Sequence, residues 1–230
     1  MDTYKNLLEL KERTKNRDIY IWGAKITGAA MGSVALRNGF DNIKAFIDSN
    51  PFAVGKILYG KKVISPDDFW SIVNLNEPPF IIVGAAIRAK EIYKICEEHG
   101  LKEEEDFCWA DDFLGPIYEF DLISTCNLSC PSCPQNNYKR HTPATMSLEK
   151  FKRSIQHIKE DTPNVAYIPL FCWTEPLLRK DLVDFLRVLK DENVLGIIST
   201  NFSLEVPHLV DIIKLQPEYF RVSMSGYYQE

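Results

Sequence analysis

The sequence predicts an α/β protein built from two successive units, each with a parallel sheet. Short apolar runs alternate with amphipathic stretches along most of the chain, and such alternation is typical of parallel sheets with helical crossovers. The run over residues 19–22 is apolar on both faces, as expected of a strand that helices cover on both sides. The pattern changes around Gly115 and Pro116, a turn-forming pair that marks a junction. We therefore expect one unit over residues 1–115 and a second over residues 116–230.

Composition sets the broad class of protein. The chain has 230 residues, of which 45% are hydrophobic, and this is enough for a core in each unit. Its formal net charge is −5, and the acidic run over residues 103–106 is most simply a solvated turn, so nothing suggests a nucleic-acid partner. No apolar run approaches the length of a membrane span, and the first residues lack the layout of a signal peptide. We expect a cytoplasmic protein that binds neither nucleic acid nor membrane.

The first unit has a Rossmann-like layout. A helical face over residues 3–15 precedes the buried strand at 19–22, which ends in a glycine-containing turn. The next strand, predicted over residues 43–47, finishes at Asp48, 25 residues after Gly23. Further elements are expected as a strand at 62–65, a helix starting at 65–68, a strand at 79–83 and a helix at 87–98.

Gly23, Gly28 and Asp48 are the candidate nucleotide-binding residues of this unit. Lys25 stands where a second glycine would let the backbone approach a pyrophosphate, so we predict poor dinucleotide binding. Two interpretations stay open: the glycines make only a tight turn, or they hold a nucleotide or nucleotide-sugar. The segment 46–51, where a strand runs into an acidic turn, resembles the Rossmann-like modules found beside sugar-modifying transferases.

Three cysteines within eight residues are the strongest chemical signal in the chain. Cys126, Cys130 and Cys133 follow a predicted strand at C-x3-C-x2-C spacing, and thiolates prefer iron–sulfur clusters, zinc or copper(I). Structural zinc takes four ligands, and His141 is the nearest fourth. Three thiolates around four irons would instead leave one iron open for chemistry. The single cysteines, at 96, 108 and 172, are expected in the core.

With this loop the sequence resembles the radical SAM superfamily, whose hallmark is the C-x3-C-x2-C motif after the first strand of a partial (β/α) barrel. Residues 145–151 are similar to the family's first-helix entry, and residues 171–178 to its Gly-Gly-Glu-Pro strand end. Residues 199–201 and 221–226 are similar to later strand ends. The sequence departs from the family where Trp173 and Thr174 replace a small pair and where Ser132 replaces a common aromatic residue.

The second unit is predicted to place its polar residues at one edge of a parallel sheet. The cysteine loop, Glu175, Asn201 and residues 223–226 all come at or just after carboxyl ends of predicted strands, where parallel barrels build active sites. The expected strands are 117–123, 164–171, 195–199 and 219–224, and the expected helices are 147–159, 178–190 and 206–214.

The resemblance implies cofactors and roles for these residues. The three cysteines would ligate a [4Fe-4S] cluster, whose fourth iron would bind S-adenosyl-L-methionine for reductive cleavage and hydrogen abstraction. Glu175 would hold the methionine amino group, Ser223 the ribose, and Thr200 and Asn201 the nearby wall. Simpler interpretations remain: Glu175 ends a strand, Asn201 is a turn residue, and Ser223 faces a helix.

The predicted function is that of a radical SAM enzyme acting on a small-molecule substrate, such as a sugar or nucleotide-linked metabolite, with electrons from a ferredoxin or flavodoxin. No catalytic acid or base is identified. The alternatives are an iron–sulfur or zinc-stabilised binding or electron-transfer protein, and a nucleotide-sugar module with a degenerate barrel. Since Glu230 comes soon after the fourth predicted strand, we expect an incomplete barrel in a fragment or self-associating chain, because an open sheet edge invites pairing.

Overall fold

The structure is a computed structural model that describes residues 3–137, 144–215, 217 and 219–223. Residue contacts divide the chain into two units. One comprises Met1–Pro116 with Thr162–Ala166, and the other comprises Ile117–Asp161 with Tyr167–Glu230. That the chain folds as two independent domains meeting near Gly115 stays a prediction.

The first unit is a six-stranded sheet in the order β3-β4-β2-β1-β5-β6. Every neighbouring pair is parallel except β3 and β4, which form an antiparallel edge. The strands are β1 (Ile19–Trp22), β2 (Ile43–Ile47), β3 (Ile57–Leu58), β4 (Lys61–Ile64), β5 (Phe80–Val83) and β6 (Phe107–Trp109).

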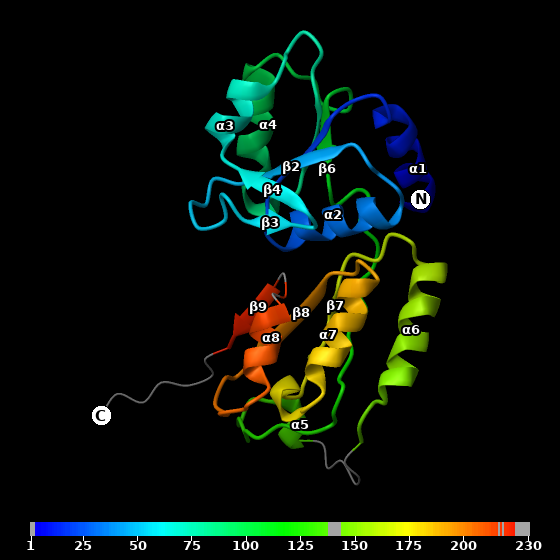
Figure 1. Ribbon diagram of the computed structural model, residues 1–230, viewed down its shortest axis with the longest axis vertical. Coiled ribbons are helices and arrows are strands. Elements are labelled where there is room, and N and C mark those ends of the chain that lie inside the picture. Colours follow the sequence, from blue (N-terminus) through cyan, green and yellow to red (C-terminus); the bar gives the residue numbers. More distant parts are fainter. Residues whose placement is uncertain (1–2, 138–143, 216, 218, 224–230) are drawn as a thin grey trace, which may run out of the picture. The chain divides into compact units, whose positions relative to one another are not determined.

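Two pairs of helices bury the two faces of this sheet, as Figure 1 shows. Helices α1 (Thr3–Thr14) and α2 (Ile26–Arg37) pack on one face, and α3 (Pro66–Ile72) and α4 (Ala89–Glu98), which follows the short helix η1 (Ala86–Arg88), pack on the other. Strand β1 supplies Ile19 and Ile21 to the first core and Tyr20 and Trp22 to the second. This alternation explains why the run is apolar on both faces.

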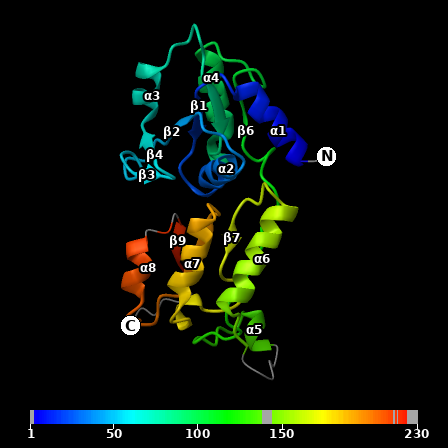
Figure 2. The same ribbon diagram turned by 45° about the vertical axis from the view of Figure 1, so that its right-hand side comes forward.

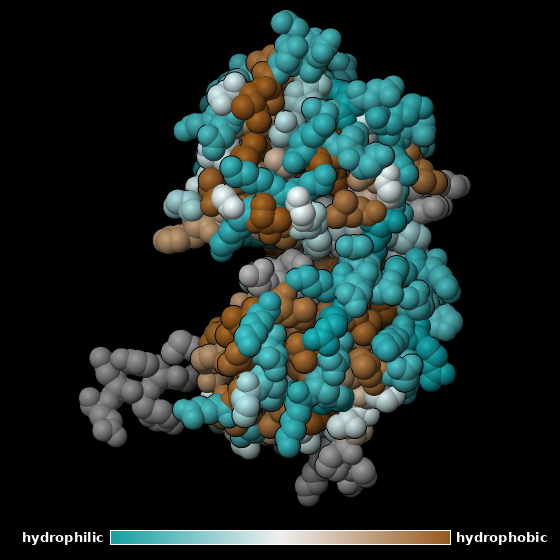
Figure 3. Space-filling view, in the orientation of Figure 1, coloured by the Kyte–Doolittle hydropathy of each residue, from teal (hydrophilic) through white to brown (hydrophobic). Residues whose placement is uncertain are grey.

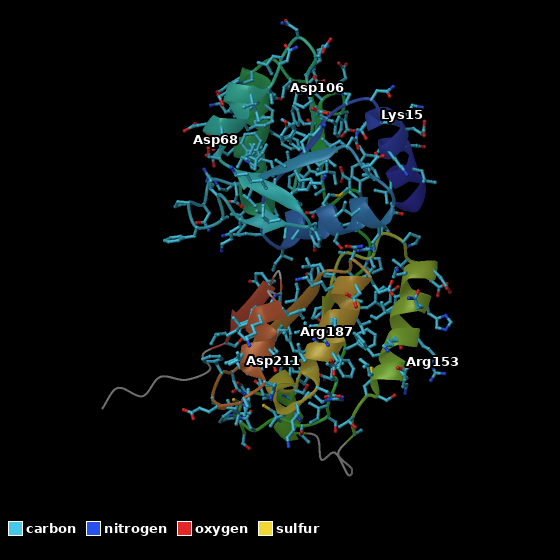
Figure 4. The ribbon with its side chains drawn as sticks, viewed as in Figure 1. Lys15, Asp68, Asp106, Arg153, Arg187 and Asp211 are labelled. Carbon is cyan, nitrogen blue, oxygen red and sulfur yellow. The ribbon has the colours of Figure 1, made fainter. Side chains whose placement is uncertain are left out.

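Polar residues stabilise two of the loops in this unit. Ser65 and Asp68 form a capping box at the start of α3, with Pro66 in the first turn, as the sequence predicts. The acidic run is more than a solvated turn, because Asp106 forms an ion pair with Arg17 at 2.7 Å and its side chain is 15% exposed. Figure 4 labels Asp68 and Asp106.

Residues 162–166 belong to the first unit although the sequence pattern assigns them to the second. Asn164 is buried, its carbonyl accepts from the Gly115 N–H at 2.7 Å, and its side chain donates to the Phe113 carbonyl at 3.1 Å. Arg37 donates to the Val165 carbonyl at 2.6 Å, and burial lowers the pKa of its guanidinium to about 10. Gly115 is required here, since a Cβ would lie 2.7 Å from the Asn164 side chain.

The second unit is a three-stranded parallel sheet in the order β7-β8-β9. Helix α7 contacts both α6 and α8, and Figure 2 shows the three helices running alongside one another. The elements are α5 (Pro134–Asn137), α6 (Leu148–Asp161), β7 (Ile168–Pro169), η2 (Pro176–Leu178), α7 (Leu182–Asp191), β8 (Gly196–Thr200), α8 (Leu209–Leu215) and β9 (Tyr219–Val222).

The α/β class with parallel sheets is confirmed, but two predicted strands are wrong in extent. Residues 117–123 form no strand, and the strand expected over 164–171 is limited to Ile168–Pro169. The first segment makes a backbone bond from Phe120 N–H to the Pro169 carbonyl and then turns to pair Leu122 with Met146. Its backbone groups are divided between two neighbours, so no ladder forms along it.

The isolated cysteines separate into two groups. Cys96 and Cys108 are fully buried, as predicted. Burial raises the pKa of the Cys96 thiol to about 12 and also raises the pKa of Cys108. The prediction for Cys172 is wrong, because its side chain is exposed just beyond β7.

Among the helices of the described residues, none combines the length and apolar content needed to cross a bilayer. Some apolar side chains are nevertheless exposed, including Val210 and Ile213 of α8. Figure 3 shows hydrophobic atoms at the surface over α7 and α8.

Candidate functional site

The cysteine loop follows residues 117–123 of the second unit and ends in the short helix α5. Cys126, Cys130 and Cys133 are all half-buried, and the Cys133 N–H donates to the Cys130 carbonyl at 3.0 Å. Ser124 ties the base of the loop to Ala144 by two hydrogen bonds, at 2.9 and 2.6 Å. The thiols are therefore presented on a loop that is anchored at its start.

Glu175 links the start of η2 to the end of β8. It follows β7, is 2% exposed, and its carboxylate accepts hydrogen bonds from the Thr200 hydroxyl at 2.6 Å and the Asn201 N–H at 2.9 Å. The same carboxylate accepts from the Leu177 N–H at 3.0 Å, which caps η2. Three donors satisfy the buried carboxylate, which therefore ties the start of η2 to the end of β8.

Asn201 connects the end of β8 to the cysteine loop. Its Nδ2 lies 3.8 Å from Cys126 Sγ and 3.0 Å from Asn127 Oδ1, and it donates to both. Asn127 in turn donates to the Ser203 hydroxyl at 2.8 Å. The structure thus brings together four residues predicted for the site, namely Cys126, Glu175, Thr200 and Asn201.

Ser223 lies at the end of β9, next to Thr200 in the ladder. Its N–H donates to the Thr200 carbonyl at 2.7 Å, and its hydroxyl is 2.7 Å from that of Ser199. Arg221 donates to the same Ser199 hydroxyl at 2.9 Å and lies over the Phe171 ring. These contacts place Ser223 on the sheet face opposite the Thr200 side chain. Its proposed ribose contact stays a prediction, and residues 224–226 of the motif lie outside the described residues.

Asp121 holds the segment that departs from the family pattern. Its carboxylate accepts from the Cys172 N–H at 2.9 Å, the Trp173 N–H at 3.3 Å and the Thr174 hydroxyl at 2.6 Å. Trp173 itself is 48% exposed. Thr174 therefore has a local role, since its hydroxyl supplies a hydrogen bond that a glycine lacks.

The three thiols of the loop are the type of ligand that an iron–sulfur cluster takes. All six cysteines lie in the described part of the chain and none forms a disulfide. Within the described ranges, no group of three or more His, Cys, Asp or Glu side chains is placed to hold a metal ion. A cluster would therefore have to bring the three sulfurs together as it binds, since metal binding is coupled to the folding of its site. Gln135, two residues after Cys133, has a buried Oε1 that accepts no hydrogen bond from the described residues.

The nucleotide-site candidates of the first unit all have contacts within the protein. A Cβ on Gly28 would lie 1.8 Å from the Gly23 carbonyl oxygen, and one on Gly84 would lie 2.5 Å from Gly28 Cα. Asp48 accepts from the Ala24 N–H at 2.9 Å and from the Asn50 N–H at 2.8 Å. These contacts explain the glycines and the aspartate by packing and turn formation, and their nucleotide role stays a prediction.

Sequence reasoning missed Asp121, Asn127 and Ser203. Asn127 directly follows a candidate ligand, which is a signal for a residue that shapes the loop. Asp121 lies inside an apolar stretch, and a carboxylate there needs a partner. Ser203 carries no such signal, because its role depends on the fold.

Comparisons with known proteins give distant likenesses. No family model matches the sequence. The chain is 26% identical over 148 residues to 7,8-dihydro-6-hydroxymethylpterin dimethyltransferase of Methanocaldococcus jannaschii, a match covering 48% of this chain and 29% of the relative. The chain thus spans less than a third of that enzyme's length. A crystal structure of BtrN in complex with AdoMet and 2-DOIA matches with 25% identity and a TM-score of 0.43, covering 51% of this chain and 49% of BtrN. By sequence, the chain is distantly similar to part of an enzyme.

Proposed function

We propose that this chain is the cluster-binding part of a radical SAM enzyme. Cys126, Cys130 and Cys133 would hold a [4Fe-4S] cluster and leave one iron for S-adenosylmethionine. The observation that carries this proposal is the Asn201 bridge, which brings the first cysteine to the carboxyl end of the parallel strand β8. A site at that edge of the sheet is where parallel α/β enzymes bind their substrates.

The bound cluster supplies the electron for reductive cleavage of the cofactor. The protein's own residues orient the site around it. Glu175 ties the start of η2 to the end of β8, Asp121 sets the path of residues 172–174, and Asn201 sets the position of the first thiol. The Glu175 carboxylate already accepts three hydrogen bonds within the protein. Glu175 is therefore better suited to position the backbone beside the cofactor than to serve as the sole ligand of the methionine amino group.

The substrate is proposed to be a small molecule, such as a sugar or a nucleotide-linked metabolite, with a ferredoxin or flavodoxin as electron donor. The likeness to a pterin dimethyltransferase adds heterocyclic compounds to the classes worth assaying. A reducing compartment suits a loop of three thiols, so we place the protein in the cytoplasm.

An anaerobic cleavage assay tests this function. Reconstituted protein, reduced with dithionite, is expected to convert S-adenosylmethionine to methionine and 5′-deoxyadenosine. The triple variant Cys126→Ala/Cys130→Ala/Cys133→Ala should form neither product, while Cys96→Ala should retain activity because Cys96 lies in the core of the first unit. Cofactor cleavage that persists in the triple variant would reject the proposal.

A structural zinc site is the second candidate, motivated by the same loop. It needs a fourth ligand, and the predicted one, His141, lies outside the described residues. Stoichiometric zinc in protein purified without oxygen would favour it.

A further inference from the structure

The sulfur of Cys126 is approached by two N–H donors. The Leu128 N–H donates to Sγ at 3.5 Å, and the Asn201 side-chain amide donates at 3.8 Å. The first donor belongs to the loop itself. The second comes from residue 201, 75 positions away, just beyond β8.

The orientation of the Asn201 amide is fixed by its other contacts. Its Oδ1 accepts from both the N–H and the hydroxyl of Ser203, at 3.0 and 2.6 Å. This leaves Nδ2 to face Cys126 and Asn127, and the hydrogen-bond network therefore assigns the amide without ambiguity. The backbone N–H of Asn201 is held by the buried carboxylate of Glu175 at 2.9 Å. The donor is held by two independent anchors.

We propose that Asn201 is a positioning residue that tunes the cluster through an N–H···S hydrogen bond to Cys126. The inference rests on the proposed function, since it needs the cluster to be bound. Hydrogen bonds to cluster sulfurs are one of the factors that set reduction potential. A donor stabilises added negative charge on the sulfur, so it favours the reduced cluster and raises the potential. Asn201 thus makes the cluster easier to reduce.

The variant Asn201→Asp keeps the shape of the side chain while it removes the donor and adds a charge beside Cys126, so it is paired with the uncharged Asn201→Leu. The aspartate retains an oxygen for the Ser203 donors and the backbone N–H for Glu175, but it loses the donor to Cys126. Asn76→Asp is the matched control, since it adds the same charge at an exposed site in the first unit. The measurement is the midpoint potential of the reconstituted cluster, titrated by EPR, together with iron content and far-UV circular dichroism.

We expect Asn201→Asp to bind iron like the wild type and to shift the midpoint potential to a more negative value, while Asn76→Asp leaves it unchanged. Asn201→Leu, which removes the donor without adding charge, should shift it in the same direction by less. Equal potentials in wild type, Asn201→Asp and Asn201→Leu would overturn the inference and leave the proposed function intact. A wild-type protein that binds no iron–sulfur cluster would overturn both. If Asn201→Asp fails to fold by circular dichroism, Asn201→Leu alone decides the outcome.

Discussion

Glu175 is a buried carboxylate whose hydrogen bonds join the end of β8 to the start of η2. Its partners are the Thr200 hydroxyl and the N–H groups of Asn201 and Leu177. A buried charge is retained in a fold when such partners satisfy it, and removing it leaves those donors unpaired. At the scale of the residue, Glu175 is therefore both a structural acceptor and the support of Asn201.

The change Glu175→Gln is expected to destabilise the protein by about 2 kcal/mol. The new amide N–H₂ would face an N–H or O–H donor whose hydrogen bond the carboxylate accepts in the wild type. Urea denaturation of metal-free protein, followed by circular dichroism, measures this. Glu160→Gln, on the exposed side of α6, is the control and should change stability by about 0.5 kcal/mol or less. A Glu175→Gln variant as stable as the control would show that the bonds to the replaced oxygen contribute nothing.

The buried thiols give a second residue-scale prediction. In native metal-free protein, iodoacetamide should label the half-buried cysteines of the loop and the exposed Cys172, but not Cys96 or Cys108. Burial excludes the reagent and raises the pKa of both thiols, to about 12 for Cys96, so little thiolate forms. Mass spectrometry of the labelled peptides measures this. Rapid native labelling of Cys96 would contradict the buried position.

The same thiols predict an alkaline limit to stability. A thiol whose pKa is raised on folding holds its proton in the native state at pH values where the unfolded chain has lost it. The contribution of the Cys96 thiol to the free energy of unfolding is fully present below the ordinary pKa of 9.0. It is lost as the pH rises toward 12. The urea midpoint should therefore fall between these values, and Cys96→Ala should reduce the slope of that fall.

The turn between β1 and α2 shows how an element depends on close backbone approach. Gly28 lies against the Gly23 carbonyl, and Gly84 of the next crossover lies against Gly28. The sequence pattern of glycines is the same for a nucleotide-binding turn and for a packing turn, so it cannot separate the two. The structure favours packing, because each missing side chain is replaced by backbone atoms.

Gly28→Ala should destabilise the first unit by about 3 kcal/mol or more, since the added Cβ would lie 1.8 Å from the Gly23 carbonyl oxygen. Gly100→Ala is the control: its φ is +81° and nothing lies within 4 Å of the added Cβ. Only backbone strain remains there, about 1 kcal/mol. Thermal denaturation of both variants measures the difference, and equal losses would refute the packing role of Gly28.

At the scale of the whole molecule, hydrophobic periodicity predicts those helices and strands that bury one continuous apolar face or run. Strands β1 and β5 and helices α4 and α6 were predicted to within a few residues, because each has a continuous apolar face or run. The Ser147 cap of α6 was also predicted, and its hydroxyl accepts from the Lys150 N–H at 3.3 Å. Local chemistry determines these features.

Long-range partners account for what the sequence pattern missed. Residues 117–123 have a strand's composition but lack a continuous partner, and the grouping of residues 162–166 with the first unit depends on Arg37 and Asn164. In the candidate site, the cysteine spacing and Glu175 were recognisable from sequence. The hydrogen bond from Asn201 to Cys126 was not recognisable, because the two residues are 75 positions apart and only the fold brings them together.

Metal analysis of protein purified without oxygen is the most direct test of the cluster loop. The wild type should contain about four irons and about four acid-labile sulfides per chain. The triple Cys→Ala variant at 126, 130 and 133 should contain neither, and Cys108→Ala should match the wild type. Stoichiometric zinc without sulfide in the wild-type protein would contradict the assignment of these three cysteines to an iron–sulfur cluster.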